Sequence, residues 1–289
     1  MINLLRIGSV LMLLGRSWEH IRWGGHLRDL FYNPEGFGGW FSGLIGIPLN
    51  EIYADHFYEG VVQHIADGMG IVFLLAAVVI LFYEKLNRFK VLIYIALGLL
   101  LLTLLGIMME RHFDEWGILF EHSSQWMIPL LFLWSFNKRN DKVFIWGAIS
   151  IGLTFLCHGL YAVGYYAQPG FFVDMMIVGI GFTEDIARAQ LVTLGYLDFI
   201  FAIGMGIMLM RSLPYYNSLV MRVFINGCLI YGMLWGFITA FARVYVTYLE
   251  GQVAHWMDQY WLEFITRAPH FVVPLVLFNM YRNRTSRLI

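Results

Sequence analysis

Histidine, aspartate and arginine side chains occur at regular helical spacing inside stretches of this chain that are otherwise strongly apolar. A histidine within hydrogen-bond reach of a carboxylate can exchange a proton with it, which is the chemistry of a general acid or base. Charged groups in such apolar stretches are energetically costly and usually functional. The candidates for a binding site or an internal polar network are His20, His64, Asp67, His158, Asp198, Arg243, Arg267 and His270.

The composition identifies the elements that must position these residues. Of the 289 residues, 59% are hydrophobic and 13% are charged, and the mean hydropathy is +0.66. A soluble domain usually contains about twice that share of charged residues. The composition therefore excludes a soluble enzyme and a disordered chain, and the net charge of −1 argues against nucleic acid as a partner. We predict an all-α, polytopic membrane protein whose first partner is the lipid bilayer.

Eight segments are long and apolar enough for a helix of about 20 residues that crosses a bilayer. They lie near residues 4–23, 57–83, 89–109, 117–136, 143–167, 186–211, 218–248 and 260–281. Basic residues are concentrated in alternate connections and in the C-terminal tail, and acidic residues in the opposite loops. The positive-inside rule then predicts that both termini are cytoplasmic. We read the N-terminal stretch as a retained first span, because it has no small-residue cleavage site.

The order of features in the first half of the chain recurs in the second half. Span four contains His122 and Pro129, and span eight contains Arg267, His270 and Pro274. His20 corresponds to His158, and His64-Ile-Ala-Asp67 corresponds to Gly195-Tyr-Leu-Asp198. We predict two tandem four-helix bundles, residues 1–140 and 141–289, in the same orientation. Two resembling helical hairpins without any duplication are the alternative.

The charged and polar residues of the spans are concentrated in the outer, non-cytoplasmic half of the predicted membrane. The cytoplasmic halves are almost purely apolar, as in residues 99–105. This asymmetry predicts a polar intramembrane pocket that opens outward, and argues against a continuous pore. Some groups near the interface could simply extend to the headgroups: Glu19, Glu59, Glu121, Arg188 and Glu263. The deeper residues could also serve only to hold helices together, for example through a Glu263–Arg267 or His64–Asp67 pair.

Three short sequence features carry a resemblance to a known family. The helix with His158-Gly-Leu-Tyr-Ala162, the Gly195-Tyr-Leu-Asp198 helix and the Pro274-containing helix together resemble the DoxX-like superfamily of small four-helix bacterial membrane proteins. That resemblance implies a location in the bacterial inner membrane and a role as a subunit of a quinone-linked redox complex or as an accessory protein. The chain is more distantly similar to the membrane domain of vitamin K-dependent carboxylases. Neither likeness assigns a catalytic residue.

Three functions fit these observations. The first is a membrane accessory or subunit protein whose pocket binds a small or lipid-like ligand, such as a quinone, or a partner membrane complex. The second is a membrane enzyme that uses His158, His64, Asp67 and Asp198 as acid–base groups on the non-cytoplasmic side. The third is a proton-coupled transporter, which the apolar cytoplasmic halves disfavour.

Metal and cofactor sites have little support in the sequence. Cys157 and Cys228 lie in apolar runs without a Cys-x-x-Cys motif, and no His-x-x-x-His or His-Glu-x-x-His spacing is present. A transmembrane haem would need facing histidines, for which His158 with His64 or His20 would be the pairs. We therefore expect no metal site, regard haem as disfavoured, and keep a quinone or lipid as the possible cofactor.

Overall fold

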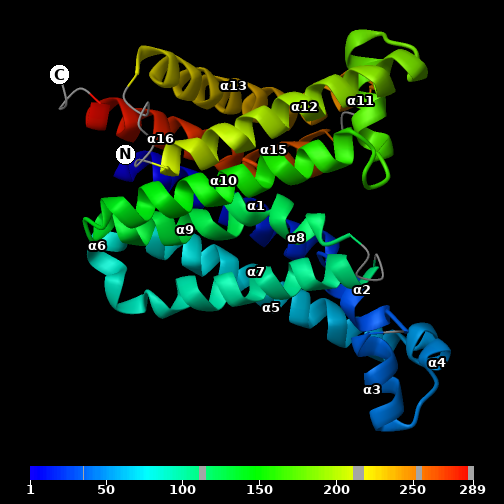
Figure 1. Ribbon diagram of the computed structural model, residues 1–289. Helices are drawn as coiled ribbons and strands as arrows, with labels where there is room; N and C mark the ends of the chain where they lie inside the picture. Colours follow the sequence, from blue (N-terminus) through cyan, green and yellow to red (C-terminus); the bar gives the residue numbers. More distant parts are fainter. Residues whose placement is uncertain (35, 111–114, 211–217, 252–255, 286–289) are drawn as a thin grey trace. The chain divides into compact units, whose positions relative to one another are not determined.

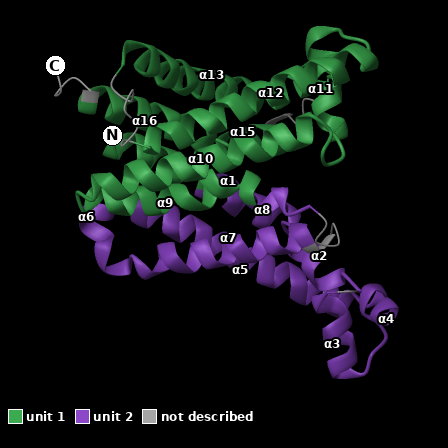
Figure 2. Ribbon diagram, viewed as in Figure 1, with its two compact units in different colours: residues 1–12, 120–289 green, residues 13–119 purple. Residues whose placement is uncertain are grey.

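The computed structural model describes residues 1–34, 36–110, 115–210, 218–251 and 256–285, and every regular element in these ranges is a helix (Figure 1). The chain forms two compact units (Figure 2). Unit 1 contains residues 1–12 and 120–289, and unit 2 contains residues 13–119. The first helix, α1 (Ile2–Trp23), contributes its first half to unit 1 and its second half to unit 2.

In the described parts of the chain, six helices are long and apolar enough to cross a bilayer, whose core needs about 20 helical residues. The first two are α5 (His56–Leu81) and the apolar part of α7 (Val91–Glu110). The next three are α10 (Asn140–Ala162), α12 (Glu184–Leu209) and α13 (Leu219–Leu249). The sixth runs from Asp258 to Arg284 through η2 (Trp256–Tyr260), α15 (Trp261–Thr266) and α16 (Pro269–Thr285). An integral, multi-pass membrane protein follows from these helices.

Two of the eight predicted spans are not among these six helices. The segment 4–23 falls in α1, which is long enough but carries Arg6, Arg16 and Glu19. The segment 117–136 is divided at His122 into α8 (Gly117–Glu121) and α9 (Ser123–Phe136). At 1.5 Å per residue, the 14 residues of α9 rise by roughly 21 Å, which is less than a hydrocarbon core of about 30 Å. Eight spans and cytoplasmic termini remain predictions.

In unit 1, α10 packs against α9, α12 and α16, while α13 packs against α12 and α16 (Figure 1). The shorter helix α11 (Gly170–Ile180) contacts α12 and α13. Glycines allow α10 and α12 to approach each other closely, as small residues do in membrane helices. A Cβ atom at Gly159 would lie 2.5 Å from the Phe199 ring, and one at Gly195 would lie 3.0 Å from the carbonyl oxygen of Gly159. This contact places His158 of α10 close to the Asp198 turn of α12.

In unit 2, α5 and α7 pack against each other and against α2 (Leu27–Tyr32). The glycine- and proline-containing segment that precedes α5 forms α2 and two further short helices, α3 (Phe37–Ile45) and α4 (Leu49–Ala54). Asp55 caps α5 by accepting a hydrogen bond from the backbone N–H of Phe57. Between α5 and α7 lie the short helices α6 (Tyr83–Leu86) and η1 (Asn87–Phe89).

The two compact units do not coincide with the predicted halves of the chain. The unit boundaries fall after residues 12 and 119, whereas the predicted halves are 1–140 and 141–289. The units reflect which residues pack together, and the predicted halves reflect a recurring order of sequence features. The tandem four-helix repeat therefore remains a prediction.

Candidate ligand-binding site

Unit 1 contains a cavity of about 480 Å³. Its walls come from α10, α11, α12, α13 and the start of α16. Most of the lining side chains are apolar, among them Phe172, Met176, Leu191, Leu194, Trp235, Phe237 and Phe241. Five of the eight sequence-predicted site residues also line it: His158, Asp198, Arg243, Arg267 and His270. The volume and the mixture of apolar walls with a few polar groups are typical of a small-molecule site.

Two histidines from different helices face each other at this cavity. The rings of His158 and His270 are 5.3 Å apart, measured between centroids, in an edge-to-face arrangement. His158 Nε2 lies 3.0 Å from a carboxylate oxygen of Glu121, the last residue of the short helix α8. His270 is 2% exposed, and its Nε2 has no hydrogen-bond partner among the residues that the structure describes. The backbone of α13 approaches it so closely that a Cβ atom at Gly236 would lie 2.5 Å from the His270 carbonyl oxygen.

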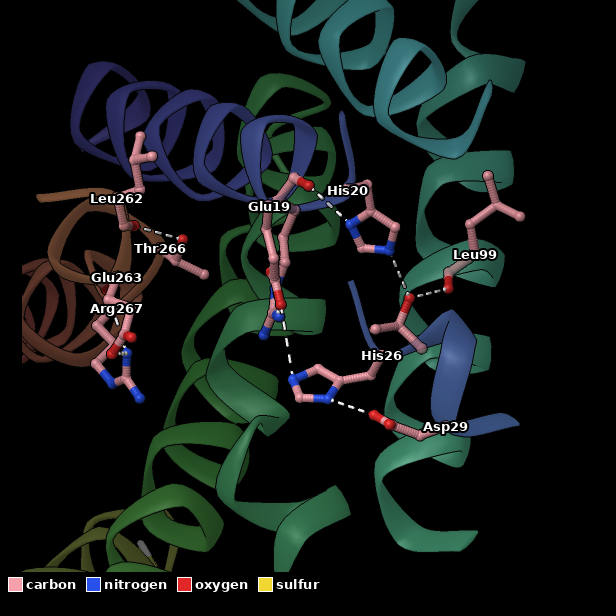
Figure 3. Close-up of polar contacts among 11 residues, drawn as sticks. Glu19, His20, His26, Asp29, Leu99, Leu262, Glu263, Thr266 and Arg267 are labelled. Atoms are coloured by element: carbon pink, nitrogen blue, oxygen red, sulfur yellow. Dashed lines mark hydrogen bonds and ion pairs between the residues drawn. The ribbon is translucent and has the colours of Figure 1, made fainter. Parts of the chain in front are cut away.

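Two arginines share one carboxylate beside the cavity. Arg243 Nη1 and Arg267 Nη1 each lie 3.3 Å from the same oxygen of Glu263, and the Glu263–Arg267 pair is visible in Figure 3. The guanidinium of Arg243 also lies over the Phe171 ring, 4.7 Å from its centroid. The Glu263–Arg267 pair that the sequence suggested is thus present, one helical turn apart.

Asp198 is the most enclosed carboxylate among the predicted site residues. It is 3% exposed and accepts a hydrogen bond of 2.7 Å from the Tyr231 hydroxyl of α13. Tyr231 in turn lies among aromatic rings of Phe155, Phe201 and Trp235. A buried carboxylate with one hydroxyl donor retains further acceptor capacity, and here that capacity is available at the cavity wall.

In unit 2, His20 is fully buried and both of its ring nitrogens have partners. Nδ1 lies 2.8 Å from the carbonyl oxygen of Arg16, and Nε2 lies 3.1 Å from the Thr103 hydroxyl of α7 (Figure 3). The ring packs edge-on against Phe73 of α5. His20 therefore joins α1, α5 and α7.

A second histidine of unit 2, His26, belongs to a chain of ion pairs that the sequence did not single out. His26 Nδ1 lies 2.8 Å from Asp29, Nε2 lies 3.7 Å from Glu19, and Glu19 pairs with Arg16 at 2.8 Å (Figure 3). Burial by itself lowers the pKa of His26, but the hydrogen bond with Asp29 and the charge of Glu19 outweigh it. The net pKa of His26 is therefore raised above its usual value.

The two remaining predicted site residues lie on α5. Asp67 accepts a hydrogen bond from Gln63, and Gln63 accepts one from Arg28 of α2. His64 is exposed and directs Nδ1 to the carbonyl oxygen of Gly60 in its own helix. Across the described part of α5, Asp67 is thus paired with Gln63 rather than with His64. Whether His20, His64 and Asp67 take part in ligand binding remains a prediction.

Three residues of the unit 1 site were not among the predicted candidates. Their positions in the sequence indicate that Glu121 and Glu263 could extend to the interface, and no sequence motif singles out Tyr231. The spacing of four residues between Glu263 and Arg267 was a usable signal, because such residues share a helix face. The pairing of Glu121 with His158 and of Tyr231 with Asp198 depends on contacts between helices, which leave no trace in sequence spacing.

The arrangement suits recognition of a molecule with an apolar body and a polar end. Among the described residues, no group of three or more His, Cys, Asp or Glu side chains is placed to hold a metal ion. The five polar groups come from α10, α12, α13, α16 and the turn between α15 and α16, and they lie on a wall that is otherwise aromatic and aliphatic. Comparisons of the chain with protein families, with curated proteins and with solved structures found no match, so the site has to be interpreted from its own geometry.

Proposed function

We propose that this protein is an integral membrane binding protein, acting as an accessory protein or subunit, whose unit 1 cavity holds a small lipid-like ligand. The cavity itself carries this proposal: about 480 Å³ of space, largely apolar walls and five converging polar side chains. An internally packed helical bundle would fill such a volume with side chains, because protein interiors are close-packed. With the predicted orientation, the polar end of the cavity lies toward the non-cytoplasmic side.

The walls support a ligand with a flexible apolar portion. Phe172 and Met176 of α11, Leu194 of α12 and Phe237 of α13 offer aromatic and thioether surface. Methionine adapts to ligands of varied shape, and aromatic rings bury a large apolar area. A quinone or a lipid fits this description, and a soluble polar metabolite does not.

A cavity-filling substitution tests the proposal. In Leu194→Trp, a large side chain occupies the cavity, whereas Ile203→Trp adds the same side chain at an exposed position of the same helix. The proteins would be extracted from membranes in native nanodiscs, and bound small molecules identified by native mass spectrometry. We expect the wild type and Ile203→Trp to carry the same ligand, and Leu194→Trp to carry at least about tenfold less, a free-energy change of about 1.4 kcal/mol.

An equal ligand content in all three proteins would show that the cavity is not the binding site. No bound molecule in the wild type, together with no stabilisation by added lipids, would contradict the proposed function as a whole. The thermal stability of Leu194→Trp in detergent serves as the folding control.

A membrane enzyme is the second candidate, and one contact favours it. His158 and Glu121 are 3.0 Å apart beside the cavity, which is the geometry of a histidine general base oriented by a carboxylate. The two functions differ in what happens to the ligand. If the ligand returns chemically unchanged after prolonged incubation with the wild-type protein, the His158–Glu121 pair is a binding element and catalysis by it is contradicted.

A further inference from the structure

Two residues that line the cavity have a buried nitrogen without a hydrogen-bond partner in the described part of the chain. His270 is 2% exposed, lines the cavity and leaves Nε2 without a partner. Arg243 also lines the cavity, and its buried Nε has no partner either. Buried nitrogens are nearly always hydrogen-bonded in folded proteins, so an unpaired one is unusual. Arg243 Nε is a donor, and His270 Nε2 is a donor in one of the two ring tautomers, so an acceptor on a ligand can satisfy both nitrogens.

The charges beside these donors favour an acceptor that is anionic. Arg243 and Arg267 share a single oxygen of Glu263, each at 3.3 Å. Charge-assisted bonds between a guanidinium and a carboxylate are usually about 2.7–2.9 Å long, so both contacts are loose. Glu121 also interacts electrostatically with both arginines, but its close contact is with His158. The other carboxylates near the cavity have partners of their own, since Glu121 contacts His158 and Asp198 accepts from Tyr231.

The apolar side chains of α13 that line the cavity indicate where the apolar portion of the ligand lies. Arg243 and Trp235 belong to the same helix, α13, and Phe237 lies between them on the cavity lining. A molecule whose head group lies against Arg243 therefore has its apolar portion beside Phe237 and Trp235. An acyl chain matches this surface, because it needs no hydrogen-bond partner along its length.

We propose that the ligand is an anionic amphiphile whose carboxylate or phosphate oxygens bind between Arg243, Arg267 and His270. Its acyl chain lies along the aromatic wall of α13 and α11. This proposal rests on the proposed function and specifies its ligand class. The same oxygen-anion chemistry occurs in a free fatty acid and in the headgroup of an anionic phospholipid, and the experiment below separates these two sources.

Quenching of Trp235 fluorescence by brominated lipids measures binding at this site. The full-length protein in nanodiscs of neutral lipid would be titrated with dibrominated stearate or with phosphatidylglycerol carrying dibrominated chains. The matched uncharged probes are the methyl ester of dibrominated stearate and a short-chain quinone. Other tryptophans are exposed, among them Trp40 and Trp146, so the signal is the quenching that disappears in Trp235→Phe.

We expect saturable quenching by an anionic probe and weaker binding, by at least about tenfold, of both uncharged probes. Quenching by stearate assigns a carboxylate, and quenching by phosphatidylglycerol alone assigns a phospholipid phosphate. Arg243→Gln and His270→Asn should each weaken anion binding by about tenfold or more. Arg188→Gln removes the same charge from an exposed position of α12 and should leave binding unchanged.

Equal binding of the acid and its methyl ester, unaffected by Arg243→Gln, would overturn the anionic head group and leave the proposed function standing. Tighter binding of the quinone than of either anionic probe would also overturn the anionic head group and leave the proposed function standing. If none of the four probes quenches Trp235, both the head-group proposal and the lipid-binding function are contradicted. Should Arg243→Gln fail to fold, Arg243→Lys keeps the charge, and it is expected to retain most of the anion binding that His270→Asn loses.

Discussion

Two buried histidines, His20 of unit 2 and His270 of unit 1, occupy equally enclosed positions but have opposite hydrogen-bonding states. His20 is 0% exposed, and both of its ring nitrogens have partners. His270 is 2% exposed, lines a cavity and has an unpaired Nε2. The difference indicates that burial alone does not identify a functional histidine. His20 therefore contributes to the fold, whereas His270 combines an incomplete set of hydrogen bonds with a place at a cavity.

The carboxylates of the two units show a similar contrast. In unit 2, Glu19, His26 and Asp29 form a continuous chain of pairs, and Asp67 is bonded to Gln63. In unit 1, Glu263 is shared by two arginines at long distances. Glu19 and Asp29 of unit 2 thus each have a partner at 2.8 Å, whereas the carboxylate that Arg243 and Arg267 share lies 3.3 Å from both. This contrast is the physical basis for placing the binding site in unit 1.

The largest effect is expected from removing the satisfied histidine. His20→Ala deletes a fully buried ring, its contact with Phe73 and its bond to Thr103, so we expect a loss of about 3 kcal/mol in the free energy of unfolding. His270→Ala in the ligand-free protein should cost less than about 1 kcal/mol, because the unpaired nitrogen is removed along with the ring. Equilibrium unfolding in mixed micelles measures both values. Equal losses would abolish the distinction between the two histidines.

A smaller loss of stability is expected from a substitution that separates α13 from α16 where Gly236 contacts the backbone of His270. In Gly236→Ala, the new Cβ atom would lie 2.5 Å from the backbone carbonyl oxygen of His270, so α13 and α16 must move apart. We expect a destabilisation of about 2 kcal/mol, typical of overpacking, together with weaker ligand binding.

Gly227→Ala is the matched control in the same helix, because a Cβ atom there meets nothing within 4 Å. It should be neutral or slightly stabilising, since alanine favours a helix more than glycine does. Unchanged stability and binding in Gly236→Ala would mean that the α13–α16 contact does not position His270.

The smallest effect is expected from the pH dependence of unit 2. The pKa of His26 is raised in the folded protein, so protonation stabilises the fold. This contribution is complete below the usual histidine pKa and is lost as the pH rises through the raised value. The melting temperature should therefore fall as the pH rises from the usual histidine pKa through the raised pKa of His26. In His26→Gln, this pH-dependent fall should be smaller. The expected change is less than about 1 kcal/mol, because the side chain of His26 is 40% exposed.

His56→Gln provides the control for this measurement, because His56 is a histidine whose side chain is 99% exposed. Its pH profile should match that of the wild type. A profile for His26→Gln as steep as that of the wild type would place the origin of the pH dependence elsewhere.

The sequence alone determined the class of the protein and much of its local structure. The share of apolar residues and the length of apolar runs predict a multi-pass helical membrane protein, because only a helix satisfies the backbone hydrogen bonds inside a bilayer. Six of the predicted spans correspond to long apolar helices. The pairing of Glu263 with Arg267 was also predictable, because residues four apart lie on one helix face.

Only the tertiary structure decided which of the polar residues form a site. His158, Asp198, Arg243 and His270 come from four helices, and their convergence depends on how each helix is rotated about its axis and how closely the glycines let it approach its neighbours. The same was true of His20 and His64, which look alike in the sequence but are respectively enclosed and exposed. Sequence spacing fixes the neighbours of a side chain within its own helix, whereas packing between helices fixes whether its hydrogen bonds are completed by the protein or left for a ligand.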